Sequence, residues 1–363
     1  MDSLRAIAAL GVLVGHVGFI THTQQTHWYG AIMSNFVSGV AIFFVLSGFL
    51  LYRPFFSAEI AGTPRPRVRD YTRRRLLRIV PAYWLALTLL AIEPGLTGVF
   101  TGDWWRYYGF LQIYDPFTRD AGLTVAWTLC IEMTFYLALP VYAALTRRIA
   151  RGASATGRTR IQLAILGVLG LASILLGVAR DPNVTPSLLS YFDWFAIGMS
   201  LAVLSVALQG RARPPAPVRF IAARPGAVWG IGLAVYLTLC VVLSSAPAFA
   251  YYSPAQTIIE HVGEGAVALF VVLPAVFGDR RVGWPRRLLA DRRLMWMGGI
   301  SYGIYLWHLS VAQWLFGKGA SGFGPLLAAT VIGAVVIAAA SYYLVERPVL
   351  RFKESRPRSL SSR

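Results

Sequence analysis

The sequence predicts an all-α, polytopic membrane protein with ten transmembrane helices and both termini in the cytoplasm. Of its 363 residues, 56% are hydrophobic and only 14% are charged, a composition outside the range of ordinary soluble domains. The apolar residues fall in stretches of about twenty, the length that a helix needs to cross a hydrocarbon core of ~30 Å. We therefore expect the bilayer to be the solvent for most of the chain.

Apolar windows place the ten helices. The predicted spans are residues 4–22, 31–52, 79–97, 125–146, 161–179, 187–208, 228–245, 255–277, 294–316 and 323–345. The stretch 104–113 is aromatic but too short and too polar to span, so it predicts an interfacial or re-entrant piece. The spans form one membrane domain, residues 1–346, followed by a basic cytoplasmic tail, residues 347–363.

The positions of Lys and Arg give the orientation. Thirty of the thirty-four basic residues fall at the N-terminus, in alternate loops and in the tail, and the opposite side holds only Arg106, Arg119, Arg180 and Lys318. Cytoplasmic loops of membrane proteins carry such an excess. The net charge of +18 is therefore an orientation signal instead of a nucleic-acid footprint, and we expect a multi-pass protein of the cell membrane with no nucleic-acid partner.

Ionisable residues inside a span are costly, and each is a candidate for function. His16 lies eleven residues after Arg5, about 16 Å along a helix and on the same face. The other such residues fall in the outer half of their spans under this topology, which predicts a polar cavity open to the outside. They are Glu132, Asp193, Glu260, His261, Glu264 and His308.

An arginine-rich run leads into the third span. Within it, Arg75 and Arg78 are spaced i, i+3, which puts two guanidinium groups on one helix face where they can hold a phosphate or pyrophosphate. The alternative is an ordinary positive-inside loop in contact with anionic lipid, and that explanation accounts for most of the run.

Six segments in order resemble the bacterial integral membrane acyltransferases of family three. The first helix, Asp2 to His16, resembles that family's opening motif, a basic residue and a His separated by ten positions. The other matching segments are Phe43-Phe44-Val45-Leu46-Ser47-Gly48-Phe49-Leu50, Arg75-Leu76-Leu77-Arg78, Trp127 to Glu132 with Phe135-Tyr136, Ser301 to His308, and Glu346-Arg347-Pro348. The resemblance covers almost the whole chain.

This resemblance implies a membrane O-acyltransferase that moves an acetyl or other short acyl group from acyl-CoA to a hydroxyl of a saccharide, glycolipid or glycosylated small molecule. Arg75 and Arg78, with Arg5, are then expected to bind the donor, since coenzyme A carries several phosphate charges. The alternatives for Arg5 are an ion pair with Asp2 and a topology charge that snorkels to the interface. His16 is expected to act as general base, because an alcohol is a poor nucleophile until an imidazole accepts its proton. Direct transfer and a transient acyl-imidazole both stay open.

The remaining polar residues have less specific assignments. Glu132 is a second catalytic candidate that would orient His16 or bind acceptor hydroxyls. Ser47-Gly48-Phe49 is interpreted first as helix packing, with lining of the donor tunnel as the second interpretation. An acceptor cavity would be lined by Asp193, Glu260, His261, Glu264, Tyr305 and His308. No His/Cys/Asp cluster has metal-ligand spacing, so we expect no metal and no permanently bound cofactor, with acyl-CoA acting only as co-substrate.

The alternative function is a proton-coupled transporter or exporter without covalent chemistry, because carriers also use intramembrane His and Glu. Carriers commonly place paired Gly- or Pro-interrupted spans in two related halves, and this sequence shows no such pair. The balance therefore favours the enzyme.

Overall fold

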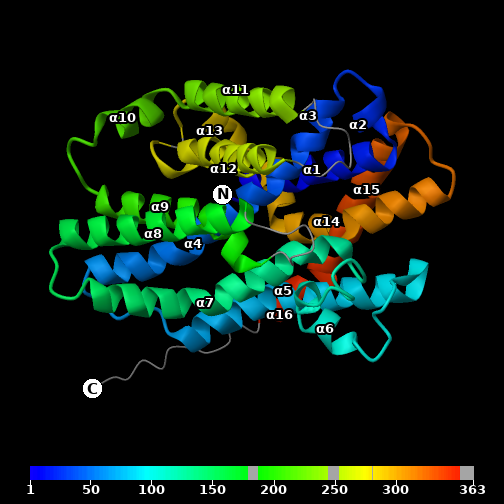
Figure 1. The fold of residues 1–363 in the computed structure, drawn as a ribbon, viewed down its shortest axis with the longest axis horizontal. Coiled ribbons are helices and arrows are strands. Elements are labelled where there is room, and N and C mark those ends of the chain that lie inside the picture. The colour runs from blue at the N-terminus through cyan, green and yellow to red at the C-terminus, as the bar shows by residue number, and fades with distance from the viewer. Residues whose placement is uncertain (179–186, 244–252, 280, 352–363) are drawn as a thin grey trace.

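A computed structural model describes residues 1–178, 187–243, 253–279 and 281–351, and within these ranges every regular element is helical (Figure 1). The helices are α1 (Asp2–Ile20), α2 (Thr23–Thr26), α3 (Gly30–Ser34), α4 (Gly39–Ile60), α5 (Val68–Leu90), α6 (Trp104–Tyr108), α7 (Trp127–Ile149), α8 (Ala155–Val178), α9 (Phe192–Ala207), α10 (Ala216–Ala223), α11 (Pro225–Leu243), α12 (Pro254–Val276), α13 (Trp284–Leu289), α14 (Arg292–Gly317), α15 (Phe323–Ser341) and α16 (Arg347–Arg351). Short 3-10 turns are η1 (Asn35–Ser38), η3 (Gln112–Tyr114), η4 (Thr124–Ala126) and η5 (Leu188–Ser190), and π turns are η2 (Ala91–Gly95) and η6 (Tyr342–Glu346).

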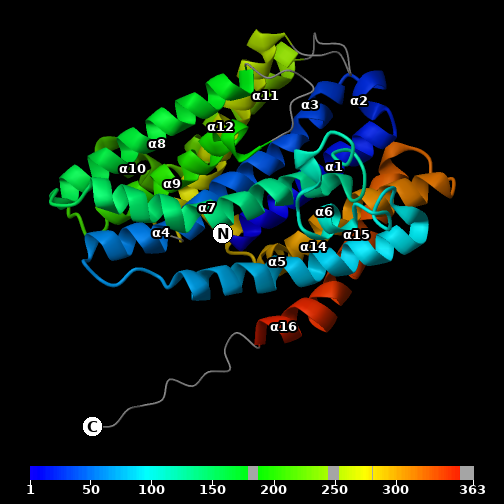
Figure 2. The same cartoon turned by 60° about the horizontal axis from the view of Figure 1, so that its bottom comes forward.

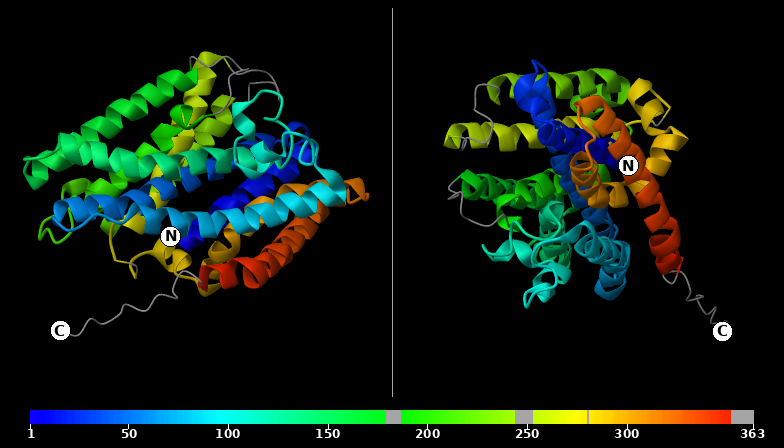
Figure 3. Two further views of the ribbon diagram at one scale, coloured as in Figure 1. Left: turned by 90° about the horizontal axis from the view of Figure 1, so that it is seen from below. Right: turned by 90° about the vertical axis from the view of Figure 1, so that its right-hand side faces the viewer.

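The long helices lie side by side in one bundle, which the turned views in Figures 2 and 3 also show. In the described part of the chain, eight helical stretches are long and apolar enough to cross a membrane. The all-α, polytopic membrane fold is therefore confirmed. The other two predicted spans, 187–208 and 294–316, correspond to α9 and α14, which are not among these eight, so the count of ten and the cytoplasmic termini stay predictions.

Several helix boundaries differ from the prediction. The second span begins as two short pieces, α3 and η1, and the long helix α4 continues to Ile60. Helix α5 begins at Val68, eleven residues before the predicted start. Arginine is a good helix former, so the basic run extends the helix beyond the apolar window even though it lowers hydropathy. The predicted tail begins as α16; its residues 352–363 lie outside the described part, and the domain boundary at 346 stays a prediction.

Close helix contacts position the core. Gly48 on α4 and Gly198 on α9 lie against each other's helix backbone, at Phe195 and Val45 respectively, with no room for a Cβ atom. Helices α1 and α14 also pack closely. They run parallel, because the backbone of Asp2 contacts Gly298 and His16 meets His308 ten residues further along α14. The interpretation of the Ser47-Gly48 segment as packing is thus confirmed for Gly48.

The segment between α5 and α7 packs onto the bundle instead of spanning it. The Tyr83 hydroxyl on α5 donates to the Tyr107 carbonyl at 2.8 Å, and the Trp84 indole N–H donates to Tyr108 O at 3.0 Å. At its end, η4, the side chains of Val125 and Ala126 are buried and Thr124 is exposed. Helix α7 therefore begins where this segment packs against the bundle.

Candidate active site

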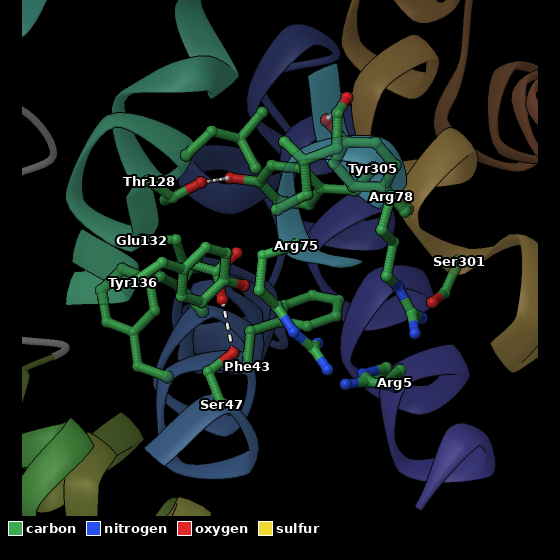
Figure 4. A pocket seen from close by; sticks show the side chains of 15 residues that line it. Arg5, Phe43, Ser47, Arg75, Arg78, Thr128, Glu132, Tyr136, Ser301 and Tyr305 are labelled. Carbon is green, nitrogen blue, oxygen red and sulfur yellow. Dashed lines mark hydrogen bonds between the residues drawn. The ribbon is translucent and has the colours of Figure 1, made fainter. Parts of the chain in front are cut away.

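A cavity of about 70 Å³ lies among α1, α4, α5, α7 and α14 (Figure 4). Its charged lining is three arginines and one glutamate, which gives a formal charge of +2. The lining residues are Arg5, Val40, Phe43, Phe44, Ser47, Arg75, Arg78, Ile79, Thr128, Leu129, Glu132, Tyr136, Ser301, Tyr302 and Tyr305. The structure thus brings together all three predicted donor-binding arginines.

The three guanidinium groups of Arg5, Arg75 and Arg78 face the same region of this cavity (Figure 4). Arg5 is paired with Asp2 at 3.2 Å. The Nε atom of Arg75 is buried and has no hydrogen-bond partner among the described residues. An unsatisfied buried donor costs about 1–3 kcal/mol, so this arrangement favours a ligand that brings acceptor oxygens.

Glu132 lies on the opposite wall of the same cavity, where its Oε1 accepts a hydrogen bond from Ser47 Oγ at 2.6 Å. Glu132 shares this cavity with Arg5 and Arg75, which come from the first halves of α1 and α5. Its place in the outer half of its span stays a prediction. Its side-chain hydrogen-bond partners are Ser47 and Tyr136, and no hydrogen bond joins it to His16.

Aromatic side chains of α4 and α14 form another wall. The Tyr305 hydroxyl donates to the Val125 carbonyl at 3.1 Å and lies 2.9 Å from Thr128 Oγ1. Its ring packs against Phe43, with centroids 5.7 Å apart, and against His308, also at 5.7 Å. Tyr305 therefore lies between the arginine cavity and His308, and its hydroxyl is held by α7 and η4.

His16 is partly exposed and does not line the cavity. Its Nδ1 lies 2.9 Å from Nε2 of His308, whose side chain is fully buried. The Nδ1 atom of His308 lies 3.1 Å and 2.8 Å from the carbonyl oxygens of Ile304 and Tyr305. The structure thus pairs His16 with His308, which the sequence analysis assigned only to the acceptor cavity.

A second polar cluster lies between α8, α9 and α12. His261 Nε2 and Asp193 Oδ1 are 2.8 Å apart, Ser173 Oγ donates to the same oxygen at 3.2 Å, and the His261 ring stacks on Trp194. Glu264, one turn from Glu260, accepts from Ser38 Oγ at 3.4 Å. None of these residues lines the arginine cavity, so their place in an acceptor cavity stays a prediction.

Comparison with known proteins decides the family. The model of acyltransferase family 3, described as an acyltransferase domain, matches residues 1–345. The chain belongs to this family. The family model and the candidate membrane spans place the chain among the integral membrane acyltransferases, and the resemblance carried by its six motifs is confirmed.

Among its relatives, YrhL of Bacillus subtilis, a candidate peptidoglycan O-acetyltransferase, is 26% identical over 96% of this chain and 54% of its own length. The peptidoglycan O-acetyltransferase OatA of Listeria monocytogenes is 26% identical over 86% of this chain and 49% of its own. Nodulation protein 10 of Rhizobium leguminosarum bv. viciae is 25% identical over 98% and 94%. The acyltransferase thus spans about half the length of the first two. No solved structure matches it.

The geometry adds Thr128 and Ser301 to the residues considered from sequence, and it places Ser47 at the cavity as well as beside the packing contact of Gly48. Ser47 bonds Glu132, and Thr128 and Ser301 line the arginine cavity. Ser47, Thr128 and Ser301 all belong to segments that match the family motifs, and this membership was the sign in the sequence that they lie at the site. Small hydroxyl side chains are also common in helix contacts, so the sequence alone could not separate a site residue from a packing residue.

Proposed function

We propose that this acyltransferase moves an acyl group, acetyl or another short chain, from acyl-CoA on the cytoplasmic side of the cell membrane to a hydroxyl of a saccharide. The observation that carries the proposal is the cavity in which Arg5, Arg75 and Arg78 converge and a buried Arg75 N–H lacks a partner. The diphosphate of coenzyme A supplies charge and acceptor oxygens of the kind that guanidinium groups bind best.

A saccharide acceptor is supported by the two relatives named for peptidoglycan O-acetylation. Arg5, Arg75 and Arg78 lie in the first halves of α1 and α5, the ends that the positive-inside rule predicts to be cytoplasmic, and His16 lies further along α1. The donor's flexible pantetheine arm then has to carry the thioester from the phosphate site past Tyr305 and Phe43 toward His16.

The chemistry follows from His16 as general base. His16 Nε2 takes the proton of the acceptor hydroxyl while the hydroxyl oxygen attacks the thioester carbonyl carbon. The carbon–sulfur bond of the tetrahedral intermediate then breaks, and the sulfur leaves with the proton returned by His16. The products are an O-acyl ester and free CoA, so atoms and charge balance without a further reactant.

Transfer of labelled acetyl from acetyl-CoA to peptidoglycan fragments and other saccharides by the purified chain in lipid vesicles tests the proposal. We expect transfer by the wild type, loss of at least about 100-fold with His16→Ala, and retention with His27→Ala, which removes an exposed loop imidazole. Absence of transfer with a range of acyl-CoA donors would overturn the donor assignment. Transfer that survives His16→Ala would overturn the general base.

The transporter alternative has lost its support, because the chain belongs to an acyltransferase family. The polar residues that suggested it include His16, which is the general base of the proposed reaction, and Glu132, which lines the arginine cavity.

A further inference from the structure

We infer that His308 is a positioning residue that holds His16 in the tautomer needed for catalysis. The two residues come from opposite ends of the sequence, and the packing of α1 on α14 brings their rings to a centroid distance of 5.1 Å. The inference rests on the proposed function only for its kinetic consequence; the tautomer itself follows from the hydrogen bonds.

The protons can be placed one bond at a time. The carbonyl oxygens of Ile304 and Tyr305 can only accept, so the His308 Nδ1 beside them carries a hydrogen and donates. A neutral imidazole with a hydrogen on one nitrogen has a lone pair on the other. Nε2 of His308 is therefore an acceptor.

His308 is neutral because of its surroundings. Its side chain is 0% exposed, its ring neighbours are Tyr305 and His16, and no carboxylate among the described residues forms an ion pair with it. A fully buried cation without a counter-charge is strongly disfavoured. The assignment of Nε2 as an acceptor follows.

His16 must then be the donor in the 2.9 Å contact, with its hydrogen on Nδ1. Its Nε2 carries the lone pair and bonds to no described residue. Free histidine in water favours the opposite tautomer, with the hydrogen on Nε2, which could not accept a proton there. The pairing with His308 therefore selects the tautomer whose Nε2 can act as base.

The same contact strengthens during the reaction. When Nε2 of His16 takes the acceptor's proton, the ring becomes an imidazolium that still donates through Nδ1 to His308. A hydrogen bond from a charged donor is roughly twice as strong as a neutral one, so the bond stabilises the charge that develops in the transition state. An effect of this kind lowers the barrier and appears in kcat, with little change in the KM for acyl-CoA.

Two substitutions at one position separate this role from packing. The amide oxygen of Gln reaches about where Nε2 of His308 lies and accepts a hydrogen bond, whereas Met has similar length but only a weak acceptor. We expect His308→Met to lower kcat roughly 100-fold, the size of effect seen when a supporting partner of a site histidine is removed. His308→Gln should recover to within about tenfold of wild type.

A spectroscopic measurement reads the tautomer without any turnover. ¹⁵N NMR of the full chain in vesicles, with ¹⁵N-labelled histidine and with His16→Ala to assign the signals, should show His16 protonated at Nδ1. In His308→Met that population should move toward the Nε2-protonated form, and in His308→Gln it should stay.

The outcomes are distinct. A wild-type His16 protonated on Nε2, or a Gln variant as slow as the Met variant, overturns the inference. An active enzyme in which His308→Met changes neither kcat nor the tautomer overturns the inference and leaves the proposed function standing. A chain that transfers no acyl group but shows the Nδ1-protonated His16 overturns the proposed function and supports the tautomer assignment.

Discussion

At the scale of single residues, the arginine-rich start of α5 contains side chains with different surroundings. Arg74 and Arg75 are adjacent, yet Arg74 is exposed whereas Arg75 lines the cavity with Arg78 one turn later. The helical period makes this separation, since neighbouring residues project about 100° apart. The i, i+3 pair therefore lines the cavity, while the charge of the whole run predicts the orientation of the protein.

Because Arg75 lines the cavity and Arg74 is exposed, replacing each with Lys should have unequal effects on the reaction. Arg75→Lys keeps the charge but removes the planar fork that binds phosphate oxygens in pairs. We expect the KM for acetyl-CoA to rise about tenfold, which corresponds to the loss of one charged hydrogen bond. The check is transfer kinetics at varied donor concentration. Arg74→Lys is the matched control, and equal effects from both variants would remove Arg75 from the donor site.

Outside the arginine cavity, Arg286 holds several helix ends together. Arg286 on α13 is 4% exposed and donates to the carbonyl oxygens of five residues. Four of these carbonyls, of Ile221, Ala222, Pro274 and Phe277, lie at the ends of α10 and α12, and the fifth, of Val282, lies in the turn before α13. Carbonyl groups at helix ends lack partners within the helix, so one side chain satisfies several of them.

Arg286→Lys should therefore destabilise the fold. Lysine has a single amine with three donors, which leaves at least two buried carbonyls without partners, and each costs about 1–3 kcal/mol. We expect a clear drop in the Tm of the purified chain in detergent, measured by intrinsic fluorescence. Arg287→Lys, at an exposed neighbouring position, should leave Tm unchanged. A normal Tm in both variants would show that the network contributes little.

At the scale of the helices, the contact between α4 and α9 places Ser47 opposite Glu132. Apolar side chains gain little from helix contact in lipid, so close packing between backbones is a main source of stability. Gly48 and Gly198 provide that packing, each against the other helix. Ser47 precedes Gly48, so its position depends on this contact.

Gly198→Val should push α4 and α9 apart. The added atoms would meet the backbone near Val45, and backbone atoms cannot move aside cheaply, so we expect a loss of about 1–3 kcal/mol together with reduced transfer activity. Thermal unfolding and the transfer assay check both effects. Gly167→Val on α8, where nothing lies within 4 Å, is the control. A Gly198 variant as stable as this control would contradict the close-contact account.

Most helices could be predicted from sequence because hydropathy and length define a membrane span locally. The starts of α4 and α5 could not, because Arg75 is helical despite its charge and residues 31–38 form short turns despite their apolarity. In the site, the i, i+3 spacing of Arg75 and Arg78 was sufficient to predict that both side chains face one cavity. The partners of Glu132 and of His16 depend on which helices pack together, and no local pattern carries that information.

At the scale of the whole molecule, the positive-inside distribution assigns the two faces of the bundle. The loop between α4 and α5 is then cytoplasmic, and the loop before α6 lies outside. Cysteine labelling checks this assignment, since the two native cysteines, Cys130 and Cys240, are buried.

In intact cells a membrane-impermeant maleimide should label Thr101→Cys, at an exposed position before α6. Ala61→Cys, exposed after α4, should react only after the membrane is permeabilised. The unsubstituted chain gives the background. The opposite pattern would invert the orientation and put the arginine cavity on the wrong side for a cytoplasmic donor.

The site divides into two parts along α1, with Arg5 in the cavity and His16 about 16 Å further on. Donor binding and catalysis should therefore be separable. We expect His16→Ala to bind a non-transferable acetyl-CoA analogue with wild-type Kd while transferring nothing, because its ring does not line the cavity. Arg78→Gln should raise the Kd about tenfold or more, since it removes a charge facing the phosphates. Calorimetry on the purified chain measures both. If His16→Ala also loses binding, the two parts form one site, and the donor must reach His16 already in its resting complex.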